Sequence, residues 1–322
     1  MQDGPTIEAS AAPRRLLIID GHAYAYRAFF AIRSLSSPAG QATNAIYGFI
    51  RMLAKALERV RPTHAPVIWD GGLARERMTL LPEYKAQRPE MPADLGSQLD
   101  QIIAYLRAAS VFSYVKEGCE ADDCIAAMTR QATDRGWEVV IASSDKDFMQ
   151  LVSPKVKMLN PQAKPDVLVG VEEVKCKTGV EPTQIVDWLS LIGDAVDNIP
   201  GVPGVGPKTA TDLLRQFGSI EELFRRLPEV GSERLREKLR ASQELMGRNR
   251  QLVRLKDETP CEVTLEVLTV KPGDDDALRQ LYLGWGFKTL LSELEQARLK
   301  AGDFFNAAGG KGCESPNFAL RG

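Results

Sequence analysis

Short apolar runs alternate with longer amphipathic segments through the first half of the chain. The predicted strands cover residues 14–20, 66–69, 111–115 and 139–142. The predicted helices have apolar positions three or four residues apart and cover residues 43–60, 95–109 and 120–135. Alternating strands and helices indicate a parallel sheet with helices on both faces.

The pattern changes at about residue 182, after which it predicts no further strands. Helical segments are expected over residues 184–192, 207–217, 219–227, 232–254 and 275–300. The sequence therefore predicts an α/β domain over residues 14–182 and a helical region over 183–300. Residues 1–13 and 301–322 read as flexible tails. Residues 71–92 are polar, basic and interrupted by prolines, which predicts an excursion over the surface.

The amino-acid composition excludes several classes of protein and of functional site. The five cysteines show no C-x-x-C spacing, and two histidines leave little material for a zinc site or a Ser-His-Asp triad. The N-terminus lacks the apolar core of a signal peptide, and no run approaches the length of a membrane span, so a soluble cytoplasmic protein is expected. The net charge of −2 is uninformative, but residues 206–256 hold 12 Lys and Arg against 7 Asp and Glu. An acidic site beside a basic helical region suits a polyanionic substrate.

Acidic residues follow the predicted strands. The segments concerned are Asp20, Asp70, Glu120/Asp122/Asp123, Asp145/Asp147 and Asp194/Asp197. Any one of them is explained as a strand end or a helix cap, both ordinary places for Asp. Five segments at the carboxyl edge of one sheet favour ligands of two divalent ions, Mg²⁺ or Mn²⁺, arranged for phosphodiester hydrolysis.

The glycine-rich segment over residues 201–209 is a near miss for a phosphate-binding P-loop. Pro207 intrudes before Lys208 and no strand precedes the segment, so a nucleotide-triphosphate site is rejected. Two alternatives remain: a plain turn between helices, or a helix-hairpin-helix whose second helix begins at Pro207 and exposes N–H groups to a phosphate. Lys208 favours phosphate contact.

Cations follow the first two predicted strands. By composition, residues 84–88 read as a solvated basic loop, but their position after Asp70 would let Lys85 and Arg88 reach a phosphate beside the metals. Arg27 is in the same situation. His22, next to Asp20, is expected to be a turn residue or a partner of a metal ligand rather than a ligand itself.

Together these residues resemble the 5′-nuclease domain of bacterial DNA polymerase I, part of the flap endonuclease family. The matching motifs are Leu17-Ile18-Ile19-Asp20-Gly21-His22-Ala23-Tyr24-Ala25-Tyr26-Arg27, Trp69-Asp70, Tyr84-Lys85-Ala86-Gln87-Arg88, Glu120-Ala121-Asp122-Asp123, Ser144-Asp145-Lys146-Asp147 and Gly193-Asp194-Ala195-Val196-Asp197-Asn198-Ile199-Pro200-Gly201-Val202. They extend over residues 16–294, and six weak motifs in the right order are specific.

The resemblance implies a PIN-like parallel-sheet domain followed by a helix-three-turn-helix DNA-binding region. It also implies a 5′-3′ exonuclease and 5′-flap endonuclease that needs two Mg²⁺ or Mn²⁺ ions. The implied metal ligands are Asp20, Asp70, Glu120, Asp122, Asp123, Asp145, Asp147, Asp194 and Asp197. Asp122 would bridge the ions, whereas Asp123 and Asp194 would act more through water or from behind the ligands.

Roles toward DNA follow from the same resemblance. Lys85 and Arg88 would polarise the scissile phosphodiester, and Tyr84 would stack on an unpaired terminal base. Arg27 and Arg77 would contact nearby phosphates. The duplex backbone would be bound, with a K⁺ ion, by Gly201, Gly204, Gly206, Lys208 and Thr209.

Two departures accompany the resemblance. The chain ends where the family's polymerases continue, which predicts a stand-alone nuclease or an excised domain. Trp69 and the glycines after Asp70 differ from the commoner Phe and Ala, a change that concerns packing more than ligation. The expected partners are nicked, flapped or 5′-ended duplex DNA and a separate DNA polymerase, with the chain acting as a monomer. The rival readings are an RNA-directed PIN-type ribonuclease and a catalytically silent branch-binding module.

Overall fold

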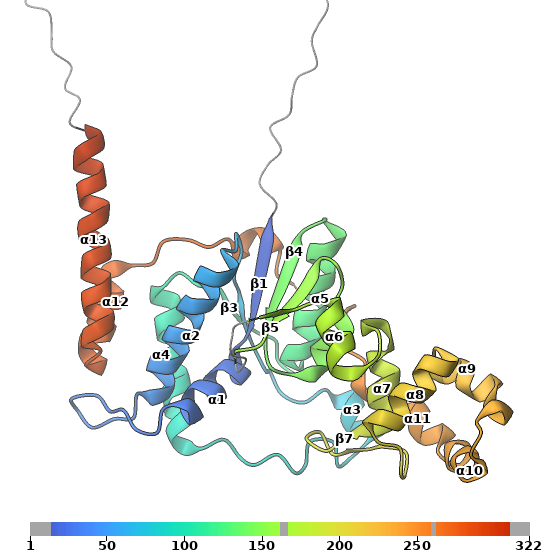
Figure 1. Ribbon diagram of the computed structural model, residues 1–322. Helices are drawn as coiled ribbons and strands as arrows, with labels where there is room; N and C mark the ends of the chain where they lie inside the picture. Colours follow the sequence, from blue (N-terminus) through green and yellow to red (C-terminus); the bar gives the residue numbers. More distant parts are fainter. Residues whose placement is uncertain (1–13, 162–166, 259–261, 310–322) are drawn as a thin grey trace, which may run out of the picture.

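The computed structural model describes residues 14–161, 167–258 and 262–309 (Figure 1). The predicted tail at residues 1–13 lies outside the described residues, as do residues 310–322 of the second tail. From residue 301 to Gly309 the backbone continues the last helix, α13 (Lys288–Gly309), where the sequence predicted a tail.

Five parallel strands and one antiparallel strand form the central sheet, in the order β3-β2-β1-β4-β5-β6. Their bounds are β1 Arg15–Asp20, β2 Val67–Trp69, β3 Ser113–Val115, β4 Glu138–Ala142, β5 Val156–Leu159 and β6 Leu168–Val169. The four predicted strands are confirmed. The sequence missed β5 and β6: the exposed Lys157 interrupts the apolar run of β5, and β6 has only two residues.

Alternate residues of the strands face two separate cores. Leu16 and Ile18 pack toward α5 (Ala121–Asp134), the 3₁₀-helix η1 (Lys146–Leu151) and α6 (Val171–Thr178). Leu17 and Ile19 pack toward the helices on the other face. Those helices are α1 (Gly21–Ala31), α2 (Asn44–Val60) and α4 (Ala93–Ala108). Because side chains alternate along a strand, both faces of β1 are buried, and the predicted two-sided sheet is confirmed.

Residues 71–92 run over the surface only in part: most of them are exposed, as predicted, but several side chains turn inward. Part of this segment forms α3 (Arg75–Leu80), and Arg77, Tyr84 and Lys85 are all buried. The reason for the error is physical. Polar composition predicts exposure unless the polar side chains can pair with buried groups of opposite charge. In this segment Arg77 and Lys85 pair with buried carboxylates, which are described below.

The chain then forms a helical region that projects from one end of the sheet domain (Figure 1). Its elements are η2 (Pro182–Gln184), α7 (Ile185–Ile192), β7 (Gly193–Asp194), β8 (Ile199–Pro200), α8 (Pro207–Phe217), α9 (Ile220–Arg225), η3 (Leu227–Glu229), α10 (Glu233–Ala241) and α11 (Gln243–Val253). Two predictions need correction. The β7–β8 pair continues strand structure past residue 182, and the single helix expected over 232–254 is two helices separated at Ser242.

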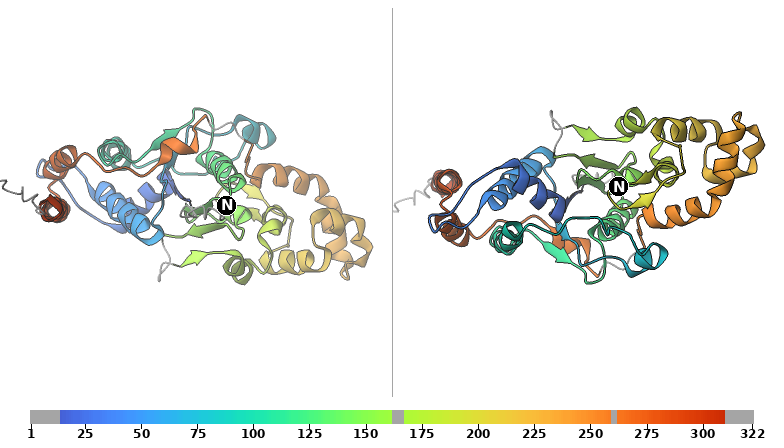
Figure 2. Two further views of the ribbon diagram at one scale, coloured as in Figure 1. Left: turned by 90° about the horizontal axis from the view of Figure 1, so that it is seen from above. Right: turned by 90° about the horizontal axis from the view of Figure 1, so that it is seen from below.

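The C-terminal helices return to the sheet domain. After η4 (Leu265–Leu268), α12 (Asp275–Trp285) packs against α4, and Arg51 of α2 pairs with Glu293 of α13 at 2.8 Å. Both views of Figure 2 place α12 and α13 at the opposite end of the molecule from α8–α10. The helical region expected over 183–300 therefore ends before η4. The helix expected over 275–300 is also broken, at Gly286, whose φ of +73° favours glycine.

None of the helices in the described ranges is both long and apolar enough to cross a membrane.

Candidate active site

The predicted gathering of acids occurs at the carboxyl edge of the sheet. Asp20 ends β1, and its side chain caps α1 by accepting a hydrogen bond from the Ala23 N–H at 3.1 Å. Its second oxygen accepts one from the Ser143 hydroxyl at 2.8 Å. Asp145 similarly caps η1 by accepting from the Asp147 N–H at 2.9 Å. The capping explanation of these acids is thus correct, but caps use only part of a carboxylate's capacity to accept.

Asp70 ties the end of β2 to the start of α5. One oxygen accepts a hydrogen bond from the Ala121 N–H at 2.8 Å, and the other lies 3.3 Å from Nδ1 of His22. Burial alone would raise the pKa of Asp70, but the contacts with His22 and Ala121 outweigh it and lower the pKa below its usual value. His22 is therefore a partner of Asp70, as predicted from the sequence.

A first group of carboxylates lies close enough together for mutual repulsion. Burial raises the pKa of Asp20 to about 6, with Asp70 and Asp145 adding to the effect. Burial together with Asp145 and Asp20 raises the pKa of Asp122 well above its usual range. The pKa of Asp145 is also raised, chiefly by burial. Desolvated carboxylates that repel one another favour protons or a divalent cation.

A second group lies beside the first. Ligand oxygens of Asp147, Asp194 and Asp197 lie within 4.8 Å of one another, and all three side chains are held away from solvent. Burial, with Asp145 and Asp194, raises the pKa of Asp147 well above its usual range. Within the described residues, the buried Oδ1 of Asp147 has no hydrogen-bond partner. Lys146 partly offsets this charge through an ion pair with Asp194 at 3.1 Å.

Two positively charged side chains of the segment between α3 and α4 lie in the site. Nζ of Lys85 lies 2.6 Å from Glu120 and 3.8 Å from Asp197, and Arg88 contacts Asp197 at 2.6 Å. Burial would lower the pKa of Lys85, but Glu120 and Asp197 raise it. Burial would raise the pKa of Glu120, but Lys85 and Arg77 lower it. Both partners are therefore charged, and Lys85 is a cation inside the carboxylate cluster rather than part of a solvated loop.

The resemblance implied that the Tyr84 ring stacks on a DNA base, but in this structure the ring is not presented for stacking. Its side chain is buried, and its hydroxyl lies 3.1 Å from Glu120 and 3.3 Å from Asp197. A buried hydroxyl must find partners, and here two carboxylates from distant segments accept from it. Tyr84 therefore fixes the positions of Glu120 and Asp197 in this structure.

The role of Arg77 also needs a correction, whereas Asp123 lies behind the ligands, as the resemblance implied. Arg77 is buried and donates two hydrogen bonds to Asp123, at 2.8 and 2.9 Å, and others to the carbonyls of Leu252 and Arg254. Arg77 therefore does not reach a DNA phosphate, and both oxygens of Asp123 are occupied by protein rather than metal. The pair joins α3, α5 and the end of α11, a structural role that the sequence could not distinguish from the neighbouring acids.

The glycine-rich segment forms a turn followed by a helix. Val202 and Val205 are buried, whereas Gly206, Pro207 and Lys208 are exposed at the start of α8. A Cβ on Gly201 would lie 2.2 Å from the carbonyl oxygen of Ile192, so only glycine permits this approach. The predicted order of helix, hairpin and helix is confirmed, while phosphate binding by Gly201, Gly204, Gly206, Lys208 and Thr209, and by the half-buried Arg27, remains a prediction.

Ser143 escaped sequence reasoning, whereas the sequence indicated Gly71 as a packing difference. Ser143 donates to Asp20 and accepts from the Asp145 N–H at 3.1 Å, so it links two metal-ligand candidates. Gly71 packs so closely on the loop before α5 that a Cβ would lie 1.7 Å from the carbonyl oxygen of Lys116. The glycine after Asp70 is thus a packing feature, as expected, and Trp69 donates a hydrogen bond from its indole to Ser113 at 2.8 Å.

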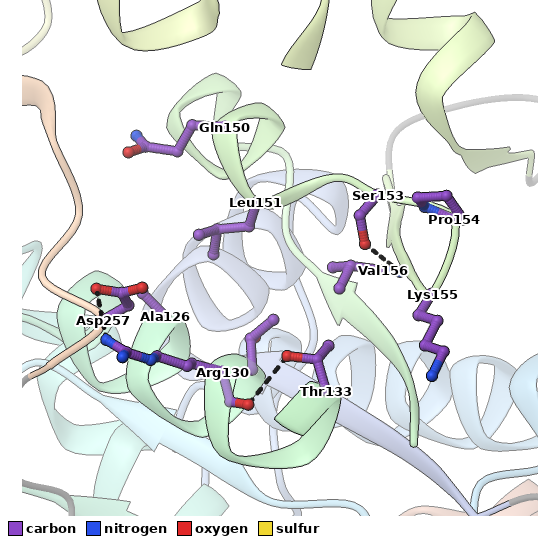
Figure 3. A pocket seen from close by; sticks show the side chains of 11 residues that line it. Ala126, Arg130, Thr133, Gln150, Leu151, Ser153, Pro154, Lys155, Val156 and Asp257 are labelled. Atoms are coloured by element: carbon purple, nitrogen blue, oxygen red, sulfur yellow. Dashed lines mark hydrogen bonds and ion pairs between the residues drawn. The ribbon is translucent and has the colours of Figure 1, made fainter. Parts of the chain in front are cut away.

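Pockets in the protein surface show where ligands could approach. One of about 520 Å³ lies between α5, the segment that joins η1 to β5, and Asp257, which faces Arg130 (Figure 3). Its lining includes none of the predicted metal ligands. Another of about 740 Å³ is lined by His22 and Asp70, and a groove of about 1150 Å³ reaches Cys119 and Asp123 at the start of α5.

Two family models match the chain. The model for "5′-3′ exonuclease, N-terminal resolvase-like domain" covers residues 15–179, and that for "5′-3′ exonuclease, C-terminal SAM fold" covers residues 180–276. They agree with the expected PIN-like sheet domain followed by a helix-three-turn-helix region.

Relatives of two lengths align with the chain. A 5′-3′ exonuclease of Aquifex aeolicus is 38% identical over 283 residues, which cover 88% of this chain and 96% of the relative. DNA polymerase I of Bacillus subtilis is 38% identical over 290 residues, which cover 89% of this chain but 33% of the polymerase. The chain thus spans about a third of the polymerase relatives and nearly all of the exonuclease.

Solved structures share the fold. Zinc-bound T5 5′-exonuclease superposes with a TM-score of 0.63 at 24% identity, covering 84% of this chain and 99% of that protein. A bacteriophage T5 D15 flap endonuclease in complex with DNA and metal ions gives 0.62 at 23% identity, covering 89% and 98%. The catalytic core of Rad2 with a DNA substrate gives 0.55 at 18% identity, covering 88% and 91%.

Proposed function

The chain belongs to the 5′-3′ exonuclease family, and on that premise we propose that it hydrolyses phosphodiester bonds at 5′ ends and 5′ flaps of duplex DNA, using two Mg²⁺ or Mn²⁺ ions. One observation carries the proposal: buried carboxylates with raised pKa values gather at the carboxyl edge of the sheet with Lys85 and Arg88 among them. The relatives' names supply the substrate class, and the site supplies the chemistry.

The residues present fit divalent ions. Hard carboxylate oxygens in this number are the donor set that Mg²⁺ and Mn²⁺ prefer. The buried Oδ1 of Asp147, which has no partner among the described residues, and the raised pKa values of Asp20 and Asp122 indicate that negative charge here exceeds the cations that the chain provides. Asp20, Asp70, Glu120 and Asp122 would hold one ion. Asp145, Asp147 and Asp197 would hold the other, with Asp194 beside them acting more through water.

When bound, the ions supply a water of lowered pKa and stabilise charge on the leaving oxygen. The protein's own residues supply position. Ser143 holds the Asp20 carboxylate and the Asp145 backbone N–H, and His22 with the Ala121 N–H holds Asp70. Preorganised groups of this kind need no rearrangement as charge develops on the phosphate.

Lys85 and Arg88 are the residues proposed to contact the scissile phosphate. They lie 2.6 Å from Glu120 and Asp197 respectively, so their charges are already within the site. Lys85 has a φ of +57°, and its backbone N–H donates to the Asp197 carbonyl at 3.0 Å, which fixes the strained turn against the opposite ligand loop. Cations held beside the ligands would receive the phosphate as it approaches.

The helical region is proposed to bind the duplex behind the cleavage point. The exposed start of α8, with Lys208 at its second position, offers N–H groups and a positive charge to a backbone phosphate. A K⁺ ion at this hairpin and a separate polymerase as a working partner belong to the same proposal. The T5 complex with DNA and the polymerases that carry a similar domain support DNA as the ligand.

Cleavage of a 5′-labelled DNA flap with Mg²⁺ and with EDTA tests the proposal. We expect short products only with Mg²⁺, and their lengths separate removal of terminal nucleotides from a cut at the junction. An RNA flap of identical sequence is the control for substrate class. Faster cleavage of RNA would replace the proposal by the ribonuclease reading, and a gel shift without any product would replace it by the silent binding module.

A further inference from the structure

Two cysteine thiols lie in contact at the start of α5. Sγ of Cys119 is 3.3 Å from Sγ of Cys124, and both side chains are buried. The residues between them include Glu120 and Asp122, which we assign to the metals. The two cysteines are five positions apart in sequence, so no C-x-x-C pattern marked them.

Helix geometry explains the contact. Glu120 is the N-cap of α5, so Cys119 precedes the cap and Cys124 is the fourth residue of the helix. These positions commonly hold two apolar side chains that pack together and fix the angle at which the chain enters the helix. Here the packed pair consists of two thiols. An S–S bond of about 2.05 Å requires the sulfurs to approach by about 1.2 Å, within the reach of small side-chain and backbone shifts.

One of the two sulfurs is open to a reagent. Cys119, which is 8% exposed, lines the groove of about 1150 Å³, whereas Cys124 is 1% exposed. The groove wall carries charges of both signs, among them Arg75, Lys116 and Glu117, so it gives a small polar reagent a path to Cys119 without selecting its charge. Cys119 is therefore the thiol that reacts first, and Cys124 is placed to resolve the product.

The same thiol is connected to the metal-ligand loops. The Cys119 carbonyl accepts a hydrogen bond from the Gly71 N–H at 2.9 Å, next to Asp70. Its Sγ contacts the Glu120 carbonyl at 3.5 Å, and that carbonyl also accepts from the Cys124 N–H at 3.4 Å. A shift of Cys119 toward Cys124 would therefore displace the segments that carry Asp70 and Glu120.

We propose that Cys119 and Cys124 form a redox modification site that takes small disulfides such as oxidised glutathione. The Cys119 sulfur attacks the reagent's disulfide, forms a mixed disulfide and releases one reduced glutathione. The Cys124 sulfur then attacks Cys119, closes the internal disulfide and releases the second glutathione, so two protein thiols are oxidised and one glutathione disulfide is reduced. Closure slows cleavage by misplacing Asp70 and Glu120, a consequence that rests on the proposed nuclease function.

The site itself is tested without any nuclease assay. In a variant carrying Cys176→Ser, Cys261→Ser and Cys313→Ser, oxidised glutathione is expected to remove both remaining thiols and to leave an intact mass without bound glutathione. Dithiothreitol should restore both thiols. Two surviving thiols, or a stable glutathione adduct, would overturn the site. Peptide mapping of the Cys119–Cys124 bond in the unaltered chain gives the same decision if the variant fails to fold.

The coupling is tested by flap cleavage before and after oxidation. A displacement of about 1 Å at reacting groups costs roughly 100-fold in rate, so we expect a loss of that order that dithiothreitol reverses. Cys119→Val removes the thiol that reacts first, so treatment with oxidised glutathione should leave the rate of this variant unchanged. A closed disulfide with an unchanged rate would overturn the coupling alone. A reduced protein that cleaves no flap would contradict the proposed function, while the thiol count still decides the site.

Discussion

The first turn of α5 presents acids to two different environments. Glu120 and Asp123 face cations of the chain itself: Lys85 at 2.6 Å and Arg77 at 2.8 Å, respectively. Asp122, between them in sequence, faces Asp20 and Asp145, and burial with these neighbours raises its pKa well above its usual range. Three neighbouring carboxylates thus differ in whether the protein itself supplies the counter-charge.

The difference separates structure from chemistry. A buried carboxylate paired with Arg contributes to the fold and keeps its charge without any ligand. A buried carboxylate that faces other carboxylates has a free-energy cost which only a proton or an external cation removes. Asp123 therefore belongs to the first kind and Asp122 to the second, and three predictions test this division.

The largest effect is expected at Asp122. Asp122→Asn keeps the shape of the side chain and removes the charge, so cleavage of a DNA flap should fall by on the order of 10³-fold, as for loss of other preorganised groups. Single-turnover kinetics measure the loss, and flap binding should remain. Asp134→Asn at the other, exposed end of α5 is the matched control and should leave the rate unchanged. Equal cleavage rates for the two variants would show that Asp122 is not part of the active site.

A large loss of stability is expected at Arg77. Arg77→Met leaves Asp123 buried without its partner and the Leu252 carbonyl without its donor, which should cost about 3–5 kcal/mol in the free energy of unfolding. Urea unfolding measures it, and adding Asp123→Leu should recover part of the loss. Arg226→Met removes an exposed pair with Glu229 and should cost far less than the change at Arg77, because solvent screens an exposed pair. A loss at Arg77 no larger than this control would contradict a structural role.

The smallest effect is a pH dependence of stabilisation by Mg²⁺. The pKa of Asp20 is about 6 in the folded protein against 3.8 normally, so its contribution to stability is present below about pH 4 and is lost as pH rises through about 6. Asp145 and Asp147, whose pKa values are also raised, have the same sign. Mg²⁺ should therefore raise the Tm by several degrees near pH 7.5 and by less near pH 5.

Thermal unfolding in EDTA and in Mg²⁺ at both pH values checks this prediction. Asp147→Asn is the internal control: it should raise the Tm in EDTA and reduce the gain from Mg²⁺, because the charge that the metal offsets is gone. A gain from Mg²⁺ that does not change with pH would show that carboxylate protonation is not what the metal replaces.

Local pattern identified four strands of the sheet and their order, but not α1, α3 or α6. The strands before Asp20, Asp70 and Asp145 were predictable because buried parallel strands are short apolar runs, and the carboxyl ends of such strands meet at one edge. β6 has only two residues, and the exposed Lys157 interrupts the apolar run of β5. The breaks at Ser242 and Gly286 fell inside helical patterns that continue across them, so the sequence predicted single helices there.

What the sequence determined alone is which acids end strands or begin helices, since hydrophobic periodicity and the position of Asp fix both. Only the tertiary structure decided their partners. Arg77 lies 46 residues before Asp123, and Arg88 lies 109 residues before Asp197. Tyr84 and Lys85 became buried for the same reason. Electrostatic pairing depends on distance in space and on desolvation, and neither is a property of a local stretch of sequence.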